Sequence, residues 1–86
     1  MKEIKWHNRA RKQMKSIPAE YREAIHERVD MLVDFPGVAG LDVKELRGHQ
    51  YQYRLRVGRY RVLFDHDSGI KIVFIQEVKK RDERTY

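Results

Sequence analysis

The stretch Tyr51–Phe64, YQYRLRVGRYRVLF, decides the fold because apolar and polar residues alternate along both of its halves. Alternation with a period of two predicts two half-buried β-strands. Gly58 and Arg59 between them fit a two-residue hairpin turn, with glycine first as a type II′ turn requires. This turn fixes the register, so three pairs share the face expected to lie against the core: Val57 opposite Tyr60, Leu55 opposite Val62, and Tyr53 opposite Phe64.

The opposite face of the predicted hairpin is cationic. Arg56 lies directly across from Arg61, and Arg54 is diagonal to that pair. Like charges directly opposite each other destabilise a sheet by some tenths of a kcal/mol. We therefore favour a bound anion, such as a phosphate, between the guanidinium groups. The alternatives are that the pair extends into solvent, or that Asp65 or Glu77 neutralises it.

The segments around the hairpin predict two helices and further strands. Residues 2–6 alternate and predict a short strand, and the apolar spacing after Asn8, a possible N-cap, predicts a helix that Pro18 ends. An apolar stripe at 21–33 predicts a second helix, joined to the first by a tight turn. Further predicted elements are a short strand at 43–46, a turn at 65–69 formed by Asp65 and Asp67, and a strand at 70–78 with apolar residues on both faces, as in the middle of a sheet.

The order of these elements predicts an α+β fold in a single domain over residues 1–86. It consists of an N-terminal β-strand, an antiparallel hairpin of two helices, and then a mainly antiparallel β-sheet. A chain this short has a thin core that a partner could complete. The longest uninterrupted apolar run, residues 72–75, is too short for a membrane span or a signal peptide, so we expect a cytoplasmic protein.

The positive charge is concentrated in the second half of the chain. Nineteen Lys and Arg residues against thirteen Asp and Glu residues give a formal net charge of +6 and a pI near 9.8. Eleven of the basic residues but only six of the acidic ones fall in 44–86, and residues 46–64 contain no acidic residue. Arginines interleaved with aromatic residues predict a polyanionic ligand, and a solvated basic face is the alternative.

No familiar enzyme constellation is present in the sequence. The chain has no cysteine and its four histidines are scattered, so we expect no metal site and no cofactor. A metal-independent ribonuclease needs a base for the attacking 2′-hydroxyl, cations for the phosphorane, and a proton for the leaving oxygen. Arginines suit the second role, whereas Tyr86 could be the base only if cations such as Lys80 and Arg81 lowered its pKa.

Three segments carry a resemblance to a known family: KELRG at 44–48, YRLRVGRYRVLF at 53–64 and VKKRDERTY at 78–86. The pattern Y-R-x-R-x-G-x-Y-R-x-x-F, followed by a late arginine and a closing tyrosine, resembles the RelE/ParE superfamily of type II toxin–antitoxin toxins, in particular its RelE-like branch. The resemblance implies a microbial-ribonuclease-like fold and a ribosome-dependent endoribonuclease that cuts mRNA in the A site, beside the 16S rRNA, and so inhibits translation. It also implies an antitoxin whose C-terminal segment wraps the toxin in a hetero-oligomer.

The resemblance also assigns roles to individual residues. It implies that the catalytic residues are Arg56, Arg61, Arg81 and Tyr86, with Arg61 stabilising the transition state and Arg84 competing with Arg81 for its role. The residues expected to bind RNA or the ribosome are Arg47, Arg54, Arg59, Lys79, Lys80 and Arg84. His49 and His66 are outside candidates, because neither clearly falls where histidine-using relatives place theirs.

Two other functions fit the same scaffold. A ParE-like toxin would inhibit DNA gyrase without ribonuclease activity, and a catalytically inactive homologue would bind RNA without cutting it. Codon-phased cuts in mRNA would indicate the nuclease, and DNA-damage signalling without cuts would indicate gyrase inhibition. Salt-sensitive RNA binding without cleavage on ribosomes would indicate the third function.

Overall fold

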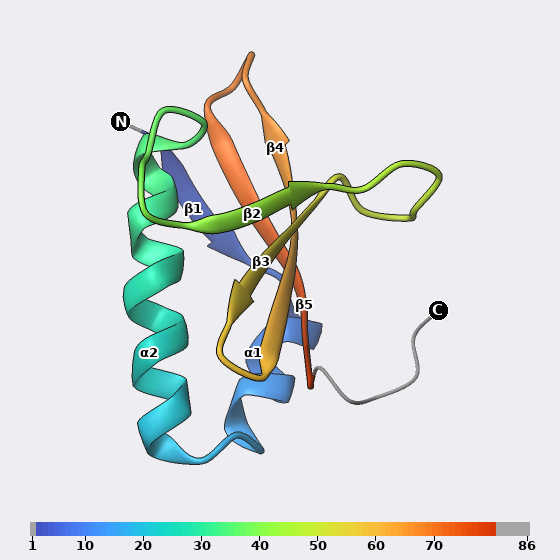
Figure 1. Ribbon diagram of the computed structural model, residues 1–86. Coiled ribbons are helices and arrows are strands. Elements are labelled where there is room, and N and C mark those ends of the chain that lie inside the picture. The colour runs from blue at the N-terminus through green and yellow to red at the C-terminus, as the bar shows by residue number, and fades with distance from the viewer. Residues whose placement is uncertain (1, 81–86) are drawn as a thin grey trace.

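The computed structural model describes residues 2–80 and has the α+β architecture predicted from the sequence (Figure 1). A short strand is followed by two helices and then by four strands. The elements are β1 (Glu3–Trp6), α1 (Asn8–Lys15), α2 (Ala19–Asp30), the short 3₁₀ helix η1 (Met31–Asp34), β2 (Asp42–Glu45), β3 (Tyr53–Val57), β4 (Tyr60–Asp67) and β5 (Ile72–Lys80).

The strands form one sheet in the order β1-β5-β4-β3-β2. β1 pairs with β5 in parallel, and the other neighbours are antiparallel. The helices lie on one side of this sheet, α1 against β5 and α2 against β3 (Figure 1). Between the two layers is one apolar core, made of Ala10, Met14, Ile17, Ile25, Val29, Leu32, Phe35, Leu55, Val57, Tyr60, Val62, Phe64, Val73, Ile75 and Val78.

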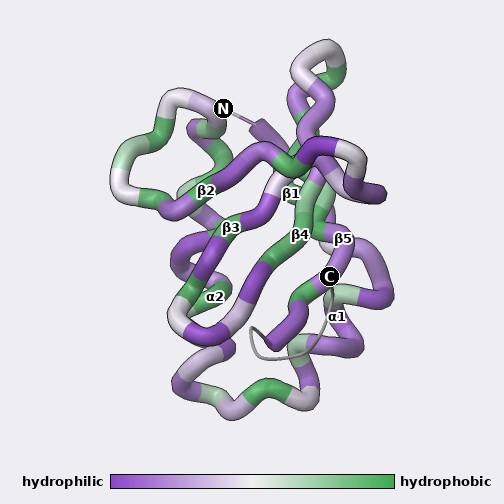
Figure 2. Tube along the Cα trace, turned by 45° about the vertical axis from the view of Figure 1, so that its right-hand side comes forward, coloured by the Kyte–Doolittle hydropathy of each residue, from purple (hydrophilic) through white to green (hydrophobic). Residues whose placement is uncertain are grey.

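The hairpin of β3 and β4 has the predicted register. Val57 pairs with Tyr60, and Arg56 pairs with Arg61. Gly58 has a φ of 58°, whereas φ at the next turn residue is not positive, which is the combination of a type II′ turn. Hydrophilic and hydrophobic segments alternate along both strands (Figure 2), so the apolar side chains enter the core and the arginines of β3 and β4 point to the other face.

A β-bulge in β5 places charged residues on that other face. Phe64 pairs with Ile75 but Leu63 pairs with Glu77, so Gln76 is an extra residue in β5. Because of this insertion Ile75 and Val78 both face the core, although they are three residues apart. The prediction of an interior strand with apolar residues on both faces is confirmed by the position of β5 between β1 and β4.

Two predicted helix boundaries were wrong. The N-cap of α1 is His7 rather than Asn8, because the His7 Nδ1 accepts a hydrogen bond of 3.0 Å from the Arg9 backbone N–H. The second helix is α-helical only to Asp30 and continues as the 3₁₀ helix. Tyr21, predicted as part of its apolar stripe, is 38% exposed.

The predicted turn at 65–69 was also placed too early. β4 continues to Asp67, and the chain reverses after it, where Asp67 Oδ1 accepts hydrogen bonds from the backbone N–H groups of Gly69 and Ile70. Asp65 instead belongs to the strand, and its Oδ1 accepts a 2.8 Å hydrogen bond from the backbone N–H of Gln52. Among the described residues, no helix is long and apolar enough to cross a membrane.

Candidate anion-binding site

The sheet face away from the helices carries a row of cations, and we call it the cationic face; it comprises Arg54, Arg56, Arg61 and Lys79. Arg56 on β3 pairs with Arg61 on β4, as predicted. Arg61 in turn pairs with Lys79 on β5. Neighbouring strands lie about 4.8 Å apart, so three positive charges stand side by side across three strands. Like charges in this arrangement repel one another, so nearby carboxylates or a bound anion stabilise it.

Arg54 lies next to this row and is unusually buried for an arginine, with 8% of its surface exposed. Its Nε has no hydrogen-bond partner within residues 2–80. Its Nη2 lies 3.5 Å from Asp42 Oδ1, and the Arg56 Nε lies 3.8 Å from Asp42 Oδ2. One carboxylate, itself 55% exposed, thus faces two guanidinium groups, which leaves capacity for a further anion.

The carboxylate that contacts Arg54 and Arg56 is therefore Asp42, which was not among the carboxylates that the sequence suggested, Asp65 and Glu77. Asp65 bonds to Gln52 and, through Oδ2, accepts a 3.1 Å hydrogen bond from the Gln76 side chain. The sequence missed Asp42 because its contact depends on the pairing of β2 with β3, where Asp42 stands opposite Arg56.

A cavity of about 300 Å³ opens among these arginines, and none of the described residues that line it carries a carboxylate. Its size and its donors suit a phosphate group, which guanidinium groups bind through paired hydrogen bonds. The residues that line it are Lys44, Leu46, Arg54, Arg56 and Arg61. The structure thus brings together three of the predicted site residues and adds Lys44 from β2.

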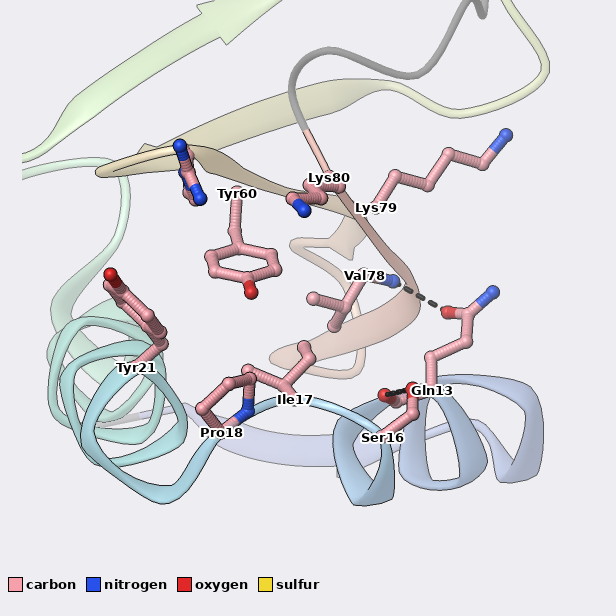
Figure 3. A pocket seen from close by; sticks show the side chains of 10 residues that line it. Gln13, Ser16, Ile17, Pro18, Tyr21, Tyr60, Val78, Lys79 and Lys80 are labelled. Atoms are coloured by element: carbon pink, nitrogen blue, oxygen red, sulfur yellow. Dashed lines mark hydrogen bonds between the residues drawn. The ribbon is translucent and has the colours of Figure 1, made fainter.

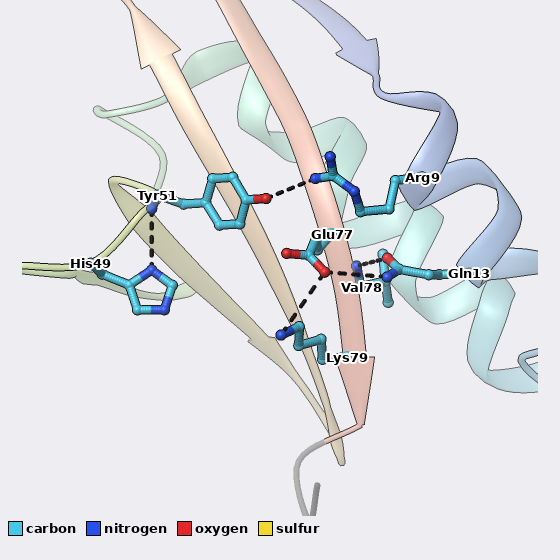
Figure 4. Close-up of polar contacts among 7 residues, drawn as sticks. All are labelled: Arg9, Gln13, His49, Tyr51, Glu77, Val78 and Lys79. Atoms are coloured by element: carbon cyan, nitrogen blue, oxygen red, sulfur yellow. Dashed lines mark hydrogen bonds and ion pairs between the residues drawn. The ribbon is translucent and has the colours of Figure 1, made fainter. Parts of the chain in front are cut away.

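Lys79 is held by a network that reaches the site from α1 (Figure 4). β1 pairs with β5 only as far as Ile75, so beyond it the β5 edge meets α1 instead. There Gln13 Oε1 accepts a 2.7 Å hydrogen bond from the Val78 backbone N–H, and its Nε2 donates to Glu77 Oε1 at 3.3 Å. The same Glu77 oxygen lies 3.9 Å from Lys79 Nζ. Glu77 therefore links Gln13 of α1 to Lys79.

Tyr51 closes the other side of this network. Its hydroxyl accepts a 2.7 Å hydrogen bond from the Arg9 guanidinium (Figure 4). Burial raises the pKa of Tyr51 and the Glu77 carboxylate raises it further, while Arg9 opposes both. Tyr51 therefore stays protonated at neutral pH and serves as a structural contact, not as a base.

The two outside histidine candidates lie away from the anion cavity. His49 Nδ1 accepts a 3.1 Å hydrogen bond from the Tyr51 backbone N–H, which shapes the loop before β3. His66 contacts the Phe35 ring on the helix side of the sheet. Burial lowers the pKa of His66, Lys2 lowers it further, and Asp67 opposes the shift. Within residues 2–80 no three His, Asp or Glu side chains form a group that could hold a metal ion.

The remaining predicted residues are spread around the cationic face. Arg47 lies in the exposed loop between β2 and β3, and Arg59 is in the hairpin turn. Arg59, Lys79 and Lys80 line a second cavity, at the end of the sheet. Arg81, Arg84 and Tyr86 lie outside the described residues, so their predicted roles stay predictions.

The fold and the site together define a class: a small basic α+β protein that presents a cationic sheet face. The model of the family described as the ParE toxin of type II toxin–antitoxin system, parDE, matches residues 4–85. The chain belongs to this family, which confirms the resemblance to the RelE/ParE superfamily.

Similar proteins carry RelE names. The RelE1 protein of Methanocaldococcus jannaschii, a toxin by name, is 26% identical over 80 residues, which cover 92% of this chain and 89% of that protein. The RelE–RelB complex from Pyrococcus horikoshii has a chain that is 29% identical, with a TM-score of 0.80 and 98% of both chains covered. The isolated RelE toxin of E. coli shares the fold at 21% identity, with a TM-score of 0.77 and coverage of 99% of this chain and 88% of that one.

Proposed function

We propose that this chain is the toxin of a type II toxin–antitoxin module and cleaves mRNA on the ribosome without a metal ion. The observation that carries the proposal is the row formed by Arg56, Arg61 and Lys79 beside the buried Arg54. Such a row suits a phosphodiester that gains negative charge during reaction. Its open position on a sheet face leaves room for RNA that is held by a larger partner.

In the proposed reaction the RNA 2′-oxygen bonds to the adjacent phosphorus and the bond from phosphorus to the 5′-oxygen breaks. The 2′-hydroxyl proton goes to a base, and the leaving 5′-oxygen takes up a proton. Arg56 and Arg61 stabilise the dianionic phosphorane, and Lys79 adds a third charge. From the family resemblance, Arg81 and Tyr86 are proposed for proton transfer and contact with the substrate.

We further propose that an antitoxin partner regulates this activity. The similar structures from P. horikoshii and E. coli include RelE–RelB complexes. A cavity lined by Lys44, Arg54, Arg56 and Arg61 would attract an acidic segment as readily as RNA. Co-expression with the neighbouring small reading frame, followed by co-purification, tests for this partner.

The experiment that tests the nuclease is the mapping of mRNA 5′ ends in a translating extract. Wild-type protein should give codon-phased cuts, and Arg61→Gln should reduce them by about a hundredfold, the typical cost of losing one transition-state donor. Lys12→Gln, an exposed cation of α1, is the matched control and should cut like wild type. Equal cutting by Arg61→Gln and wild type would contradict the site.

Inhibition of DNA gyrase is the second candidate, because the matching family model is described by ParE. A supercoiling assay with purified gyrase separates the two functions. Inhibition of gyrase together with intact mRNA would favour this candidate. Codon-phased cuts with unaffected gyrase would favour the nuclease.

A further inference from the structure

A second cavity, of about 430 Å³, lies at the end of the sheet, where the β3–β4 turn, the end of β5 and the turn between α1 and α2 meet (Figure 3). We call it the tyrosine cleft. It is lined by Gln13, Ser16, Ile17, Pro18, Tyr21, Arg59, Tyr60, Val78, Lys79 and Lys80. Of these residues, the mechanism proposed above uses only Lys79.

The tyrosine cleft combines aromatic rings with positive charge. Tyr21 from α2 and Tyr60 from β4 both line it, with ring centroids 5.6 Å apart and planes inclined by 53°. Tyr60 is almost fully buried, but 38% of Tyr21 is exposed, so its ring is available to a ligand. Ile17 and Val78 add an apolar floor.

The rim of the cleft is cationic. Arg59, Lys79 and Lys80 all line it, and no carboxylate from residues 2–80 does. Lys80 pairs with Tyr60 across the strands, and Lys79 pairs with Arg61. In Figure 3 Lys79 points outward from the rings. Lys79 thus connects the row of cations on the cationic face with the cleft around the end of β5.

We propose that the tyrosine cleft binds one nucleotide of single-stranded RNA, adjacent to the phosphate held by Arg56 and Arg61. Tyr21 stacks on the base, and Lys80 and Arg59 contact the following phosphate. Aromatic rings beside cations are the usual way in which proteins hold unpaired bases without reading their sequence. This inference rests on the proposed function in that it takes RNA as the ligand, but it does not require cleavage.

The test measures the binding of 5′-labelled 2′-O-methyl RNA, which cannot undergo attack by a 2′-hydroxyl, by fluorescence anisotropy. Tyr21→Leu removes the ring and should weaken binding of a tetranucleotide about tenfold, as expected for one lost base stack. Tyr21→Phe keeps the ring and should bind like wild type. A dinucleotide, which has the base but lacks the following phosphate, should be sensitive to Tyr21→Leu and Arg61→Gln and insensitive to Lys80→Gln.

Lys80→Gln should weaken the tetranucleotide, while Lys12→Gln, on the exposed side of α1, should not. Thermal melts of each variant show whether it is folded. If Tyr21→Leu bound the tetranucleotide like wild type while Arg61→Gln bound it more weakly, the proposal that the cleft binds a nucleotide would be wrong. The nuclease proposal would be unaffected. Failure of wild type to bind the tetranucleotide better than the dinucleotide would also overturn it.

The proposal for the tyrosine cleft and the proposal for the nuclease can be contradicted separately. Tetranucleotide binding that depends on Tyr21, without mRNA cuts in the translating extract, supports the cleft and contradicts the nuclease. An acidic partner peptide is the other ligand that such a rim could attract. If Tyr21→Leu abolished co-purification of the antitoxin but left RNA binding unchanged, the cleft would be a peptide site and the inference would be wrong.

Discussion

Arg54 is a buried cation that lies 3.5 Å from the largely exposed carboxylate of Asp42. Burying a guanidinium costs several kcal/mol unless it is well paired, and here the Nε has no partner within residues 2–80. The sequence placed Arg54 correctly on the cationic face. It could not show that this arginine is buried, because burial depends on how the loop and β2 cover the strand.

We predict that Arg54→Met leaves the free energy of unfolding unchanged or raises it by about 1 kcal/mol, because an apolar side chain of similar size avoids the desolvation cost. The Asp42 side chain is largely exposed to solvent, so the loss of Arg54 does not leave a buried carboxylate without a partner. RNA binding should weaken at the same time. Urea unfolding and fluorescence anisotropy measure the two effects, with Arg56→Met as the exposed control. A loss of more than about 2 kcal/mol would show that Arg54 is a structural residue.

His66 makes stability depend on pH. Burial lowers the pKa of His66 in the folded protein below the 6.5 of an exposed histidine, so the unfolded chain binds the proton more tightly. Its contribution is complete above pH 6.5 and is lost as the pH falls through the lower folded pKa. We expect the melting temperature of wild type to drop more between pH 7 and pH 5 than that of His66→Gln. Parallel pH profiles for the two proteins would contradict this.

At the scale of elements, the hairpin is the part that sequence predicted best. Its turn, its register and the Arg56–Arg61 pair follow from alternation and one glycine, which are local properties. The predicted end of β4 was wrong because Asp65 and Asp67 both suit turns, and only Asp67 forms one. The bulge at Gln76 could not be predicted, since it depends on which residues of β5 the core accepts.

We predict that Gly58→Ala lowers the free energy of unfolding by about 1 kcal/mol. The cause is the positive φ of 58°, since a Cβ at this position would meet nothing within 4 Å. Gly37→Ala is a matched control without a positive φ, and its Cβ would make only ordinary contact with the Asp34 carbonyl at 3.6 Å. Urea unfolding of the two variants checks the difference. Equal losses would mean that φ is not the cause.

The contact between α1 and β5 supports a second prediction. Gln13→Ala removes two hydrogen bonds and leaves the Val78 backbone N–H without its acceptor, which should cost about 1–3 kcal/mol. It should also weaken RNA binding, because Glu77 loses a contact that holds it beside Lys79. Lys12→Ala, one residue away and exposed, should change stability by less than about 0.5 kcal/mol. If Gln13→Ala were as stable as wild type, the hydrogen bonds of Gln13 to β5 would not stabilise the fold.

At the scale of the whole molecule, the net charge of +6 becomes informative only through its placement. The family and the α+β fold could be predicted from the sequence because they rest on local patterns and the order of elements. The tyrosine cleft could not, because Tyr21, Tyr60 and Lys80 come from three elements that meet only in the folded chain. Alternation placed Tyr60 in the core, and nothing local showed that its ring also lines a cavity.

We expect RNA binding to weaken steeply with salt, because the cationic face acts mainly through phosphate contacts. For single-stranded RNA the plot of log K against log salt has a slope of about −0.7 per phosphate contacted. Arg61→Gln should reduce that slope by about one such contact, whereas Tyr21→Leu should weaken binding without changing it. Anisotropy titrations between low and high salt measure both slopes. A slope that Arg61→Gln leaves unaltered would argue against a phosphate contact there.

The parallel pairing of β1 with β5 has a consequence for when the protein becomes active. Glu3 of β1 is paired with Ile72 of β5. β1 is therefore synthesised early but cannot pair until β5 has been synthesised. Contacts between segments so far apart in the chain form late in folding. β5 also supplies Lys79, so the cationic face is incomplete until residues 72–80 have left the ribosome. If the chain acts on the ribosome as proposed, we therefore expect a nascent chain to be inactive until residues 72–80 have been released and folded.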